Sequence, residues 1–109
     1  MLTFNEYANE RQQNNIKFCE NRKKGASKIA VQAKAKGGPA KLTEWHFTAK
    51  LPEYDACLKA IKEGKPASYF KEQENYFIKQ LSNIQNQRKF QEIMGKAEVW
   101  GEVYFKLNT

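Results

Sequence analysis

Few side chains in this 109-residue chain are suited to acid–base or nucleophilic chemistry. It contains one histidine, His46, and one aspartate, Asp55. A catalytic imidazole needs an orienting carboxylate and a nucleophile at fixed distances. None of the serines, Ser27, Ser68 and Ser82, lies in a nucleophile-elbow motif. We therefore expect His46 to be a surface or half-buried structural residue, and we expect no enzymatic activity.

Two further motifs have simple structural interpretations. The Gly37-Gly38-Pro39 run is followed by Lys41-Leu42-Thr43 rather than by the Lys-Ser/Thr pair of a phosphate-binding loop, so it is interpreted as a hairpin turn. Cys19 and Cys57 lie 38 positions apart, with no second pair of ligands near either. This spacing predicts no metal site and no cofactor, and the expected intracellular compartment favours two buried free thiols over a disulfide.

Charge is the strongest feature of the sequence. The net charge is +7, and residues 1–50 hold ten lysines and arginines against four acids, which accounts for +6 of it. A field of one sign on part of a small domain raises the local concentration of polyanions. It indicates an acidic or polyanionic partner without identifying it.

The elements that would position these side chains follow from periodicity and end signals. Thr3 and Glu6 fit a capping box and predict a helix over about 3–24 that ends at Gly25. Apolar and polar residues alternate in three segments, which predicts strands over 28–36, 42–51 and 99–107. Because alanine and lysine favour helices, a short helix is the alternative for the first of these segments.

Two more helices complete the predicted order. Pro52 and Gly64 bracket a short helix over 53–63, and apolar residues from Phe70 to Met94 recur at helical spacing, which predicts the main core helix. The order α-β-β-α-α-β predicts a single α+β domain over residues 1–109, a two-layer sandwich of helices on a three-stranded antiparallel sheet.

The outward face of this sheet is the predicted binding site, because it would combine cations with flat rings. Its members, extended by the basic residues before the first strand and at the hairpin tip, are Arg22, Lys23, Lys24, Lys28, Lys34, Lys36, Lys41, Lys50, Trp100 and Tyr104. Lysines that neutralise phosphates beside rings that stack on bases are typical of proteins that bind single-stranded nucleic acid. The alternative is that the first helix covers this face, which would make Trp100 and Tyr104 core residues.

Two functions remain open from the sequence. The first is a small basic nucleic-acid-binding protein that uses mainly backbone and stacking contacts. The second is a protein-interaction module, an inhibitor or adaptor of phage or mobile-element type, that docks an acidic or nucleic-acid-binding partner. No segment approaches the length of a membrane span, so we expect a cytoplasmic protein, with a homodimer formed through a sheet edge as a further option.

Overall fold

The computed structural model describes residues 3–109, and its regular elements are all helical. They are α1 (Phe4–Lys36), the 3-10 turn η1 (Gly38–Ala40), α2 (Lys41–Lys62), α3 (Ala67–Leu81) and α4 (Gln87–Leu107). None of the described residues forms a strand. The predicted α+β sandwich is therefore wrong: the fold is an all-α arrangement of four helices.

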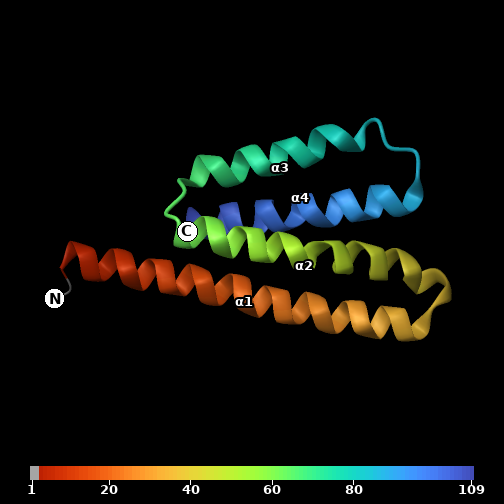
Figure 1. Cartoon of the computed structure of the whole chain (residues 1–109), viewed down its shortest axis with the longest axis horizontal. Helices are drawn as coiled ribbons and strands as arrows, with labels where there is room; N and C mark the ends of the chain where they lie inside the picture. Colours follow the sequence, from red (N-terminus) through yellow and green to blue (C-terminus); the bar gives the residue numbers. More distant parts are fainter. Residues whose placement is uncertain (1–2) are drawn as a thin grey trace.

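The helices form two antiparallel helical hairpins that pack side by side (Figure 1). The first is α1 with α2 and the second is α3 with α4, and the hairpins contact each other through α2 and α4. The order across the molecule is thus α1, α2, α4, α3, with α2 and α4 running in the same direction (Figure 1). The result is an elongated molecule of 54 × 30 × 19 Å.

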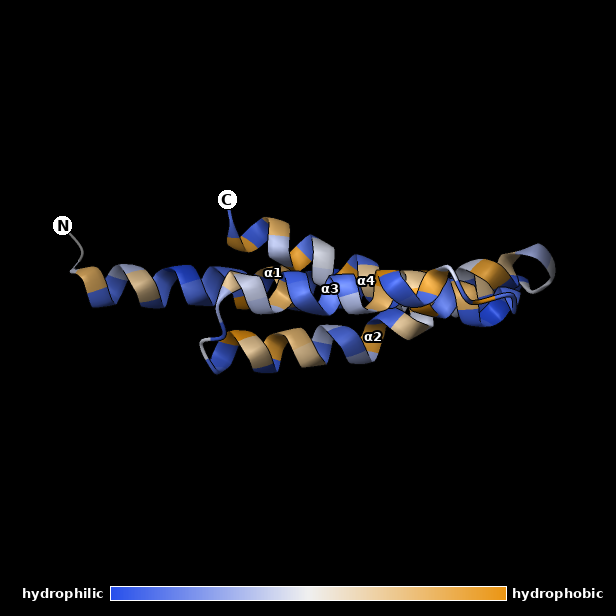
Figure 2. Cartoon of the chain, turned by 90° about the horizontal axis from the view of Figure 1, so that it is seen from above, coloured by the Kyte–Doolittle hydropathy of each residue, from blue (hydrophilic) through white to orange (hydrophobic). Residues whose placement is uncertain are grey.

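The core lies between the helices, where α1, α2, α3 and α4 each bury one face. Each helix carries both apolar and polar residues, as the hydropathy colours show (Figure 2). The side chains that α1 buries are small, which lets its backbone approach α2 closely. The buried core cluster is Cys19, Ala26, Tyr54, Cys57, Ala60, Ile61, Phe70, Val99, Trp100 and Val103. None of the helices in residues 3–109 is long and apolar enough to cross a membrane.

Local end signals predicted some boundaries well. Thr3 Oγ1 accepts a hydrogen bond from the Glu6 amide at 3.2 Å, and the Glu6 carboxylate accepts one from the Thr3 amide at 3.4 Å, which confirms the capping box. Gly64 has φ 73°, directly after the end of α2, as a helix terminator requires. Gly25, however, lies inside α1, which continues for eleven residues beyond it.

The three predicted strands are all helical. Residues 28–36 form the last turns of α1, residues 42–51 belong to α2, and residues 99–107 belong to α4. Apolar residues four positions apart satisfy a period of two as well as a period near 3.6, so short segments fit both patterns. Helix propensity and packing against the other helices therefore favour the helical conformation in these segments. Because the described residues form no sheet, there is no sheet edge through which the expected homodimer could pair.

The structure also differs from the sequence prediction at Pro52 and over residues 82–86. Pro52 lies inside α2 instead of opening a new helix, so packing of α2 between its neighbours offsets the lost backbone hydrogen bond. The predicted long helix is interrupted after Leu81, and Asn86 caps α4 by accepting a hydrogen bond from the Lys89 amide at 2.9 Å.

Candidate functional site

Seven of the ten predicted site residues fall in a stretch without any acid. Residues 21–43 contain seven lysines and arginines and neither aspartate nor glutamate. In the structure this stretch comprises the second half of α1, η1 and the start of α2, at one end of the molecule (the right-hand end in Figure 1). The cations of this stretch are therefore gathered at one end of the α1–α2 hairpin.

Five of these cations make up what we call the lysine surface: Lys24, Lys28, Lys34, Lys36 and Lys41. All five are exposed, and none forms an ion pair with another residue of the described range. Lys24 and Lys28 lie about one turn apart on an exposed face of α1, and their backbone positions are separated by about 6 Å along the helix axis. The ordered helix thus holds a short row of free positive charges.

The other two cations of the stretch are paired with acids from other helices. Arg22 donates through Nε and Nη2 to the two carboxylate oxygens of Glu102, at 3.2 and 3.0 Å. Lys23 Nζ lies 2.7 Å from Asp55 Oδ1. The charges of Arg22 and Lys23 are therefore partly neutralised by acids of the same protein.

Lys50 is not available to a partner, because its side chain is only 3% exposed. Its ammonium donates to Glu102 at 3.1 Å and lies 5.0 Å from the centre of the Phe47 ring. The Tyr54 hydroxyl donates to the other Glu102 oxygen at 2.8 Å. The predicted exposure of Lys50 is thus wrong, and Lys50 belongs to a partly buried polar network between α1, α2 and α4.

Glu102 is the acceptor that holds this network together. Burial alone would raise its pKa, but the hydrogen bonds from Arg22 and Tyr54 and the nearby charge of Lys50 outweigh burial and lower the pKa below its usual value. The carboxylate is therefore ionised at neutral pH. The pKa of Tyr54 shifts in the opposite direction, upward, because burial and the neighbouring Glu102 carboxylate disfavour the ionised phenol.

Trp100 and Tyr104 do not form the predicted stacking platform. Trp100 is 3% exposed, packs against the rings of Tyr69 and Phe70, and donates through Nε1 to Glu53 at 2.8 Å. Tyr104 is half-buried, with the Lys71 ammonium 5.5 Å from its ring centre. The outward sheet face that was to combine these rings with lysines is absent, because residues 99–107 are helical and turn Trp100 into the core.

A different ring lies close to the lysine surface. Trp45 is half-buried near the start of α2, and the Arg88 guanidinium of α4 lies 5.5 Å from its ring centre. These two side chains and Lys41 help to line a hollow of about 330 Å³, together with Glu44, Thr48 and Glu92. Sequence reasoning missed this pair because Trp45 and Arg88 meet only through the packing of α2 on α4.

His46 and the two cysteines have structural surroundings. His46 is half-buried, and its imidazole contacts the Glu98 carboxylate, where the hydrogen bond lowers the pKa of that carboxyl group. Within residues 3–109 no cluster of three potential metal ligands occurs. Both cysteines are free and buried, as predicted, and burial raises the pKa of Cys19 to about 12.

Comparison of the chain with models of known protein families, with curated protein sequences and with solved structures found no match.

Proposed function

We propose that this protein binds nucleic acid through the phosphate backbone, using the lysine surface. The observation that carries the proposal is the set of five exposed lysines without acidic partners in a segment that contains no acid. Phosphate neutralisation by lysine needs only such charges, because each bound phosphate releases condensed counterions. The same five charges repel one another in the free protein, so a polyanion relieves that repulsion.

The composition of the surface favours backbone contacts over base stacking. Residues 21–43 contain no aromatic side chain, and Trp100 is buried. Lysine acts on phosphate as a mobile point charge and carries no base-reading geometry comparable to the arginine fork. We therefore expect binding with little sequence preference, and no advantage for single strands over duplexes.

An acidic protein surface is the less favoured partner for this surface. Protein hot spots are enriched in tryptophan, tyrosine and arginine that fill pockets, whereas the lysine surface is interrupted mainly by small or polar residues. Its large exposed apolar side chains are Ile29, 38% exposed, and Val31, 66% exposed, and neither is aromatic. The surface thus offers charge without the apolar anchors that a tight protein complex uses.

The salt dependence of binding tests the proposal quantitatively. Five phosphate contacts to a duplex give a slope of log K against log salt of about −4.5, or roughly a 500-fold loss of affinity between about 50 and 200 mM salt. Fluorescence anisotropy with a labelled duplex and a single strand of equal length measures this slope. Absence of binding at the lower salt concentration would exclude the proposal.

A matched pair of double variants localises the interaction. Lys24→Gln/Lys28→Gln and Lys59→Gln/Lys62→Gln remove the same charge, but the second pair lies near the end of α2, away from the lysine surface. The first variant should make the slope less negative by about 1.8, and the second should leave it unchanged. Equal losses in both variants would show that net charge, rather than this surface, governs binding.

The second candidate, a protein-interaction module, is favoured by one separate observation. The first turns of α1 expose Phe4, at 84%, and Tyr7, and exposed aromatic rings of this kind are enriched at protein interfaces. Co-purification after nuclease digestion separates the two candidates. A partner that survives digestion and is lost in Phe4→Ser would favour the module, whereas a partner lost on digestion would favour nucleic acid.

A further inference from the structure

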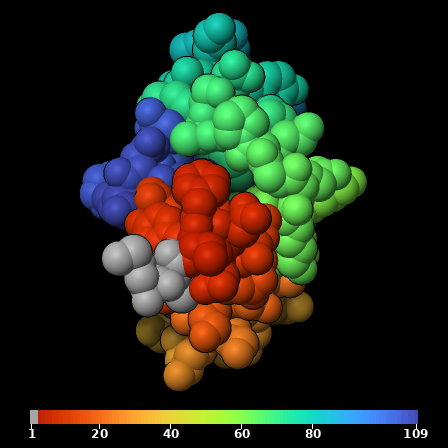
Figure 3. Space-filling view, turned by 90° about the vertical axis from the view of Figure 1, so that its left-hand side faces the viewer, coloured from red at the N-terminus to blue at the C-terminus, as the bar shows by residue number. Residues whose placement is uncertain are grey.

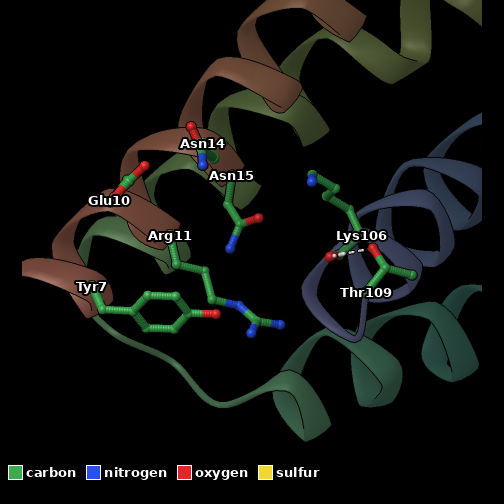
Figure 4. Close-up of a pocket in the computed structure, with 7 residues that line it drawn as sticks. All are labelled: Tyr7, Glu10, Arg11, Asn14, Asn15, Lys106 and Thr109. Atoms are coloured by element: carbon green, nitrogen blue, oxygen red, sulfur yellow. Dashed lines mark hydrogen bonds between the residues drawn. The ribbon is translucent and has the colours of Figure 1, made fainter. Parts of the chain in front are cut away.

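A polar hollow lies at the end of the molecule opposite the lysine surface. Its volume is about 390 Å³, and it is lined by Tyr7, Glu10, Arg11, Asn14, Asn15, Lys106 and Thr109 (Figure 4). Seen from this end, the start of α1 borders the last turn of α4 (red beside blue in Figure 3). The hollow is therefore formed by the two ends of the described chain.

Asn15 is the residue that suggests a ligand. It is only 7% exposed, and its side chain forms no hydrogen bond with the rest of residues 3–109. Its amide points into the hollow, on the side of Arg11 and Lys106 (Figure 4). No fully buried side-chain nitrogen or oxygen of the described residues lacks a partner, so the polar atoms of the Asn15 amide open into the hollow, where water or a ligand from solution can satisfy its donor and acceptor.

Two cations flank this amide. Arg11 Nη2 donates to the Leu107 carbonyl oxygen at 2.8 Å, which occupies one exposed carbonyl at the end of α4 and orients the guanidinium. The other guanidinium N–H groups are left without a partner among the described residues. Lys106 projects from α4 on the opposite wall (Figure 4).

The ionisable side chains that line the hollow have a positive balance. Glu10 has the single acidic side chain among the lining residues against Arg11 and Lys106, and its carboxylate is turned away from Arg11 and Asn15 (Figure 4). A guanidinium matches the geometry of carboxylate and phosphate oxygens. A neutral amide beside it donates one hydrogen bond and accepts another, which suits a hydroxyl group next to the anion.

We propose that this hollow binds a small organic anion, a phosphate or carboxylate that also carries hydroxyl groups. Arg11 and Lys106 hold the anionic group, and Asn15 hydrogen-bonds the adjacent hydroxyl, with the Tyr7 ring beside Arg11 at the edge of the hollow (Figure 4). The volume lies within the range of about 300–1,000 Å³ of small-molecule sites. The inference does not depend on the lysine surface, which lies at the other end of the molecule.

Nuclear magnetic resonance of ¹⁵N-labelled protein provides the test, because the Asn15 side-chain NH₂ pair reports directly on the site. Ribose 5-phosphate and citrate represent the phosphate and carboxylate classes, and ribose is the neutral control. We expect one of the anions to shift the Asn15 pair in a saturable manner, and ribose to have no effect. Shifts that do not saturate, or that occur equally at Lys24 and Lys28, would show charge screening only and overturn the proposal.

Variants locate the site independently. Arg11→Gln and Lys106→Gln should each raise the Kd at least tenfold, while Lys62→Gln, an exposed lysine outside the hollow, should leave it unchanged. If Arg11→Gln loses the contact with Leu107 and fails to fold, Lys106→Gln still decides the question. Unchanged affinity in Lys106→Gln, with the fold intact, would overturn the assignment.

Discussion

Replacement of Glu102 by glutamine should be among the most destabilising single changes in this protein. Glutamine keeps the size of the side chain and can still accept from Tyr54, but it removes the charge that neutralises Lys50. The Lys50 ammonium lies 3.1 Å from the carboxylate and is 3% exposed. The remaining nearby acid, Glu98, is already paired with His46.

The magnitude follows from the geometry. Two unit charges at 3.1 Å attract by about 5 kcal/mol at an effective dielectric constant of about 20. Removal of one partner of a buried ion pair costs about 3–5 kcal/mol, because the other charge stays buried without a partner. We therefore expect Glu102→Gln to lower the free energy of unfolding by about 3–5 kcal/mol, a large fraction of the about 5–15 kcal/mol of a typical domain.

The reciprocal change should cost much less. In Lys50→Met, Glu102 keeps the two hydrogen bonds from Arg22 and the one from Tyr54, and methionine fills the space beside the Phe47 ring. We expect a loss of about 1 kcal/mol or less. The double variant Lys50→Met/Glu102→Gln should regain most of the stability lost in Glu102→Gln, since no buried charge remains without a partner.

Urea denaturation followed by circular dichroism measures all three variants, and urea is preferred because it does not screen charges. Equal losses in the two single variants would refute the reasoning. So would a double variant that is as unstable as Glu102→Gln, because the penalty would then not come from the unpaired Lys50.

Further predictions concern packing, reactivity and pH. Gly95→Ala should destabilise the protein by about 1–3 kcal/mol, because a Cβ at this position would overlap the backbone of α2. Gly25→Ala should instead stabilise the protein by about 0.5–1 kcal/mol, because a Cβ there meets open space. Urea denaturation measures both variants, and an unchanged stability of Gly95→Ala would contradict the packing of α2 on α4. Cys19 and Cys57 should react with a thiol reagent at about pH 8 only after unfolding, since both are buried with raised pKa values; rapid labelling of the folded protein would exclude this. The hydrogen bond from the His46 imidazole lowers the pKa of Glu98, so the ionised Glu98 should stabilise the fold above its ordinary pKa of 4.5, and this contribution should be lost as the pH falls below that value. The stabilities of the wild type and of Glu98→Gln should therefore converge below pH 4.5. A difference that stays constant with pH would contradict the contact between His46 and Glu98.

The sequence allowed correct prediction where neighbouring residues alone decide the outcome. The capping box at Thr3 and Glu6 needs only residues three positions apart. The end of α2 before Gly64 needs only one residue with positive φ. The two buried free thiols were predicted from the absence of further ligands near either cysteine and from the expected compartment.

Prediction failed where short apolar patterns fit two structures. Val99, Val103 and Leu107 are spaced by four, so they fall on one face of a strand and also on one face of a helix. The hydrophobic pattern could not distinguish these arrangements over nine residues. The packing of residues 99–107 against α2 and α3 places Val99, Trp100 and Val103 together in the core, which only a helix allows because Trp100 would face the other side of a strand.

The sequence by itself determined the positive charge, its concentration in residues 1–50 and the local start of α1, because these depend on composition and on neighbouring residues. The tertiary structure decided which of the cations are free. Lys50 and Lys28 are chemically equivalent in the sequence, yet Lys50 is buried against Glu102, 52 residues away, while Lys28 remains in solvent. That difference arises from the side-by-side packing of α2 and α4, which creates contacts between residues that are distant along the chain.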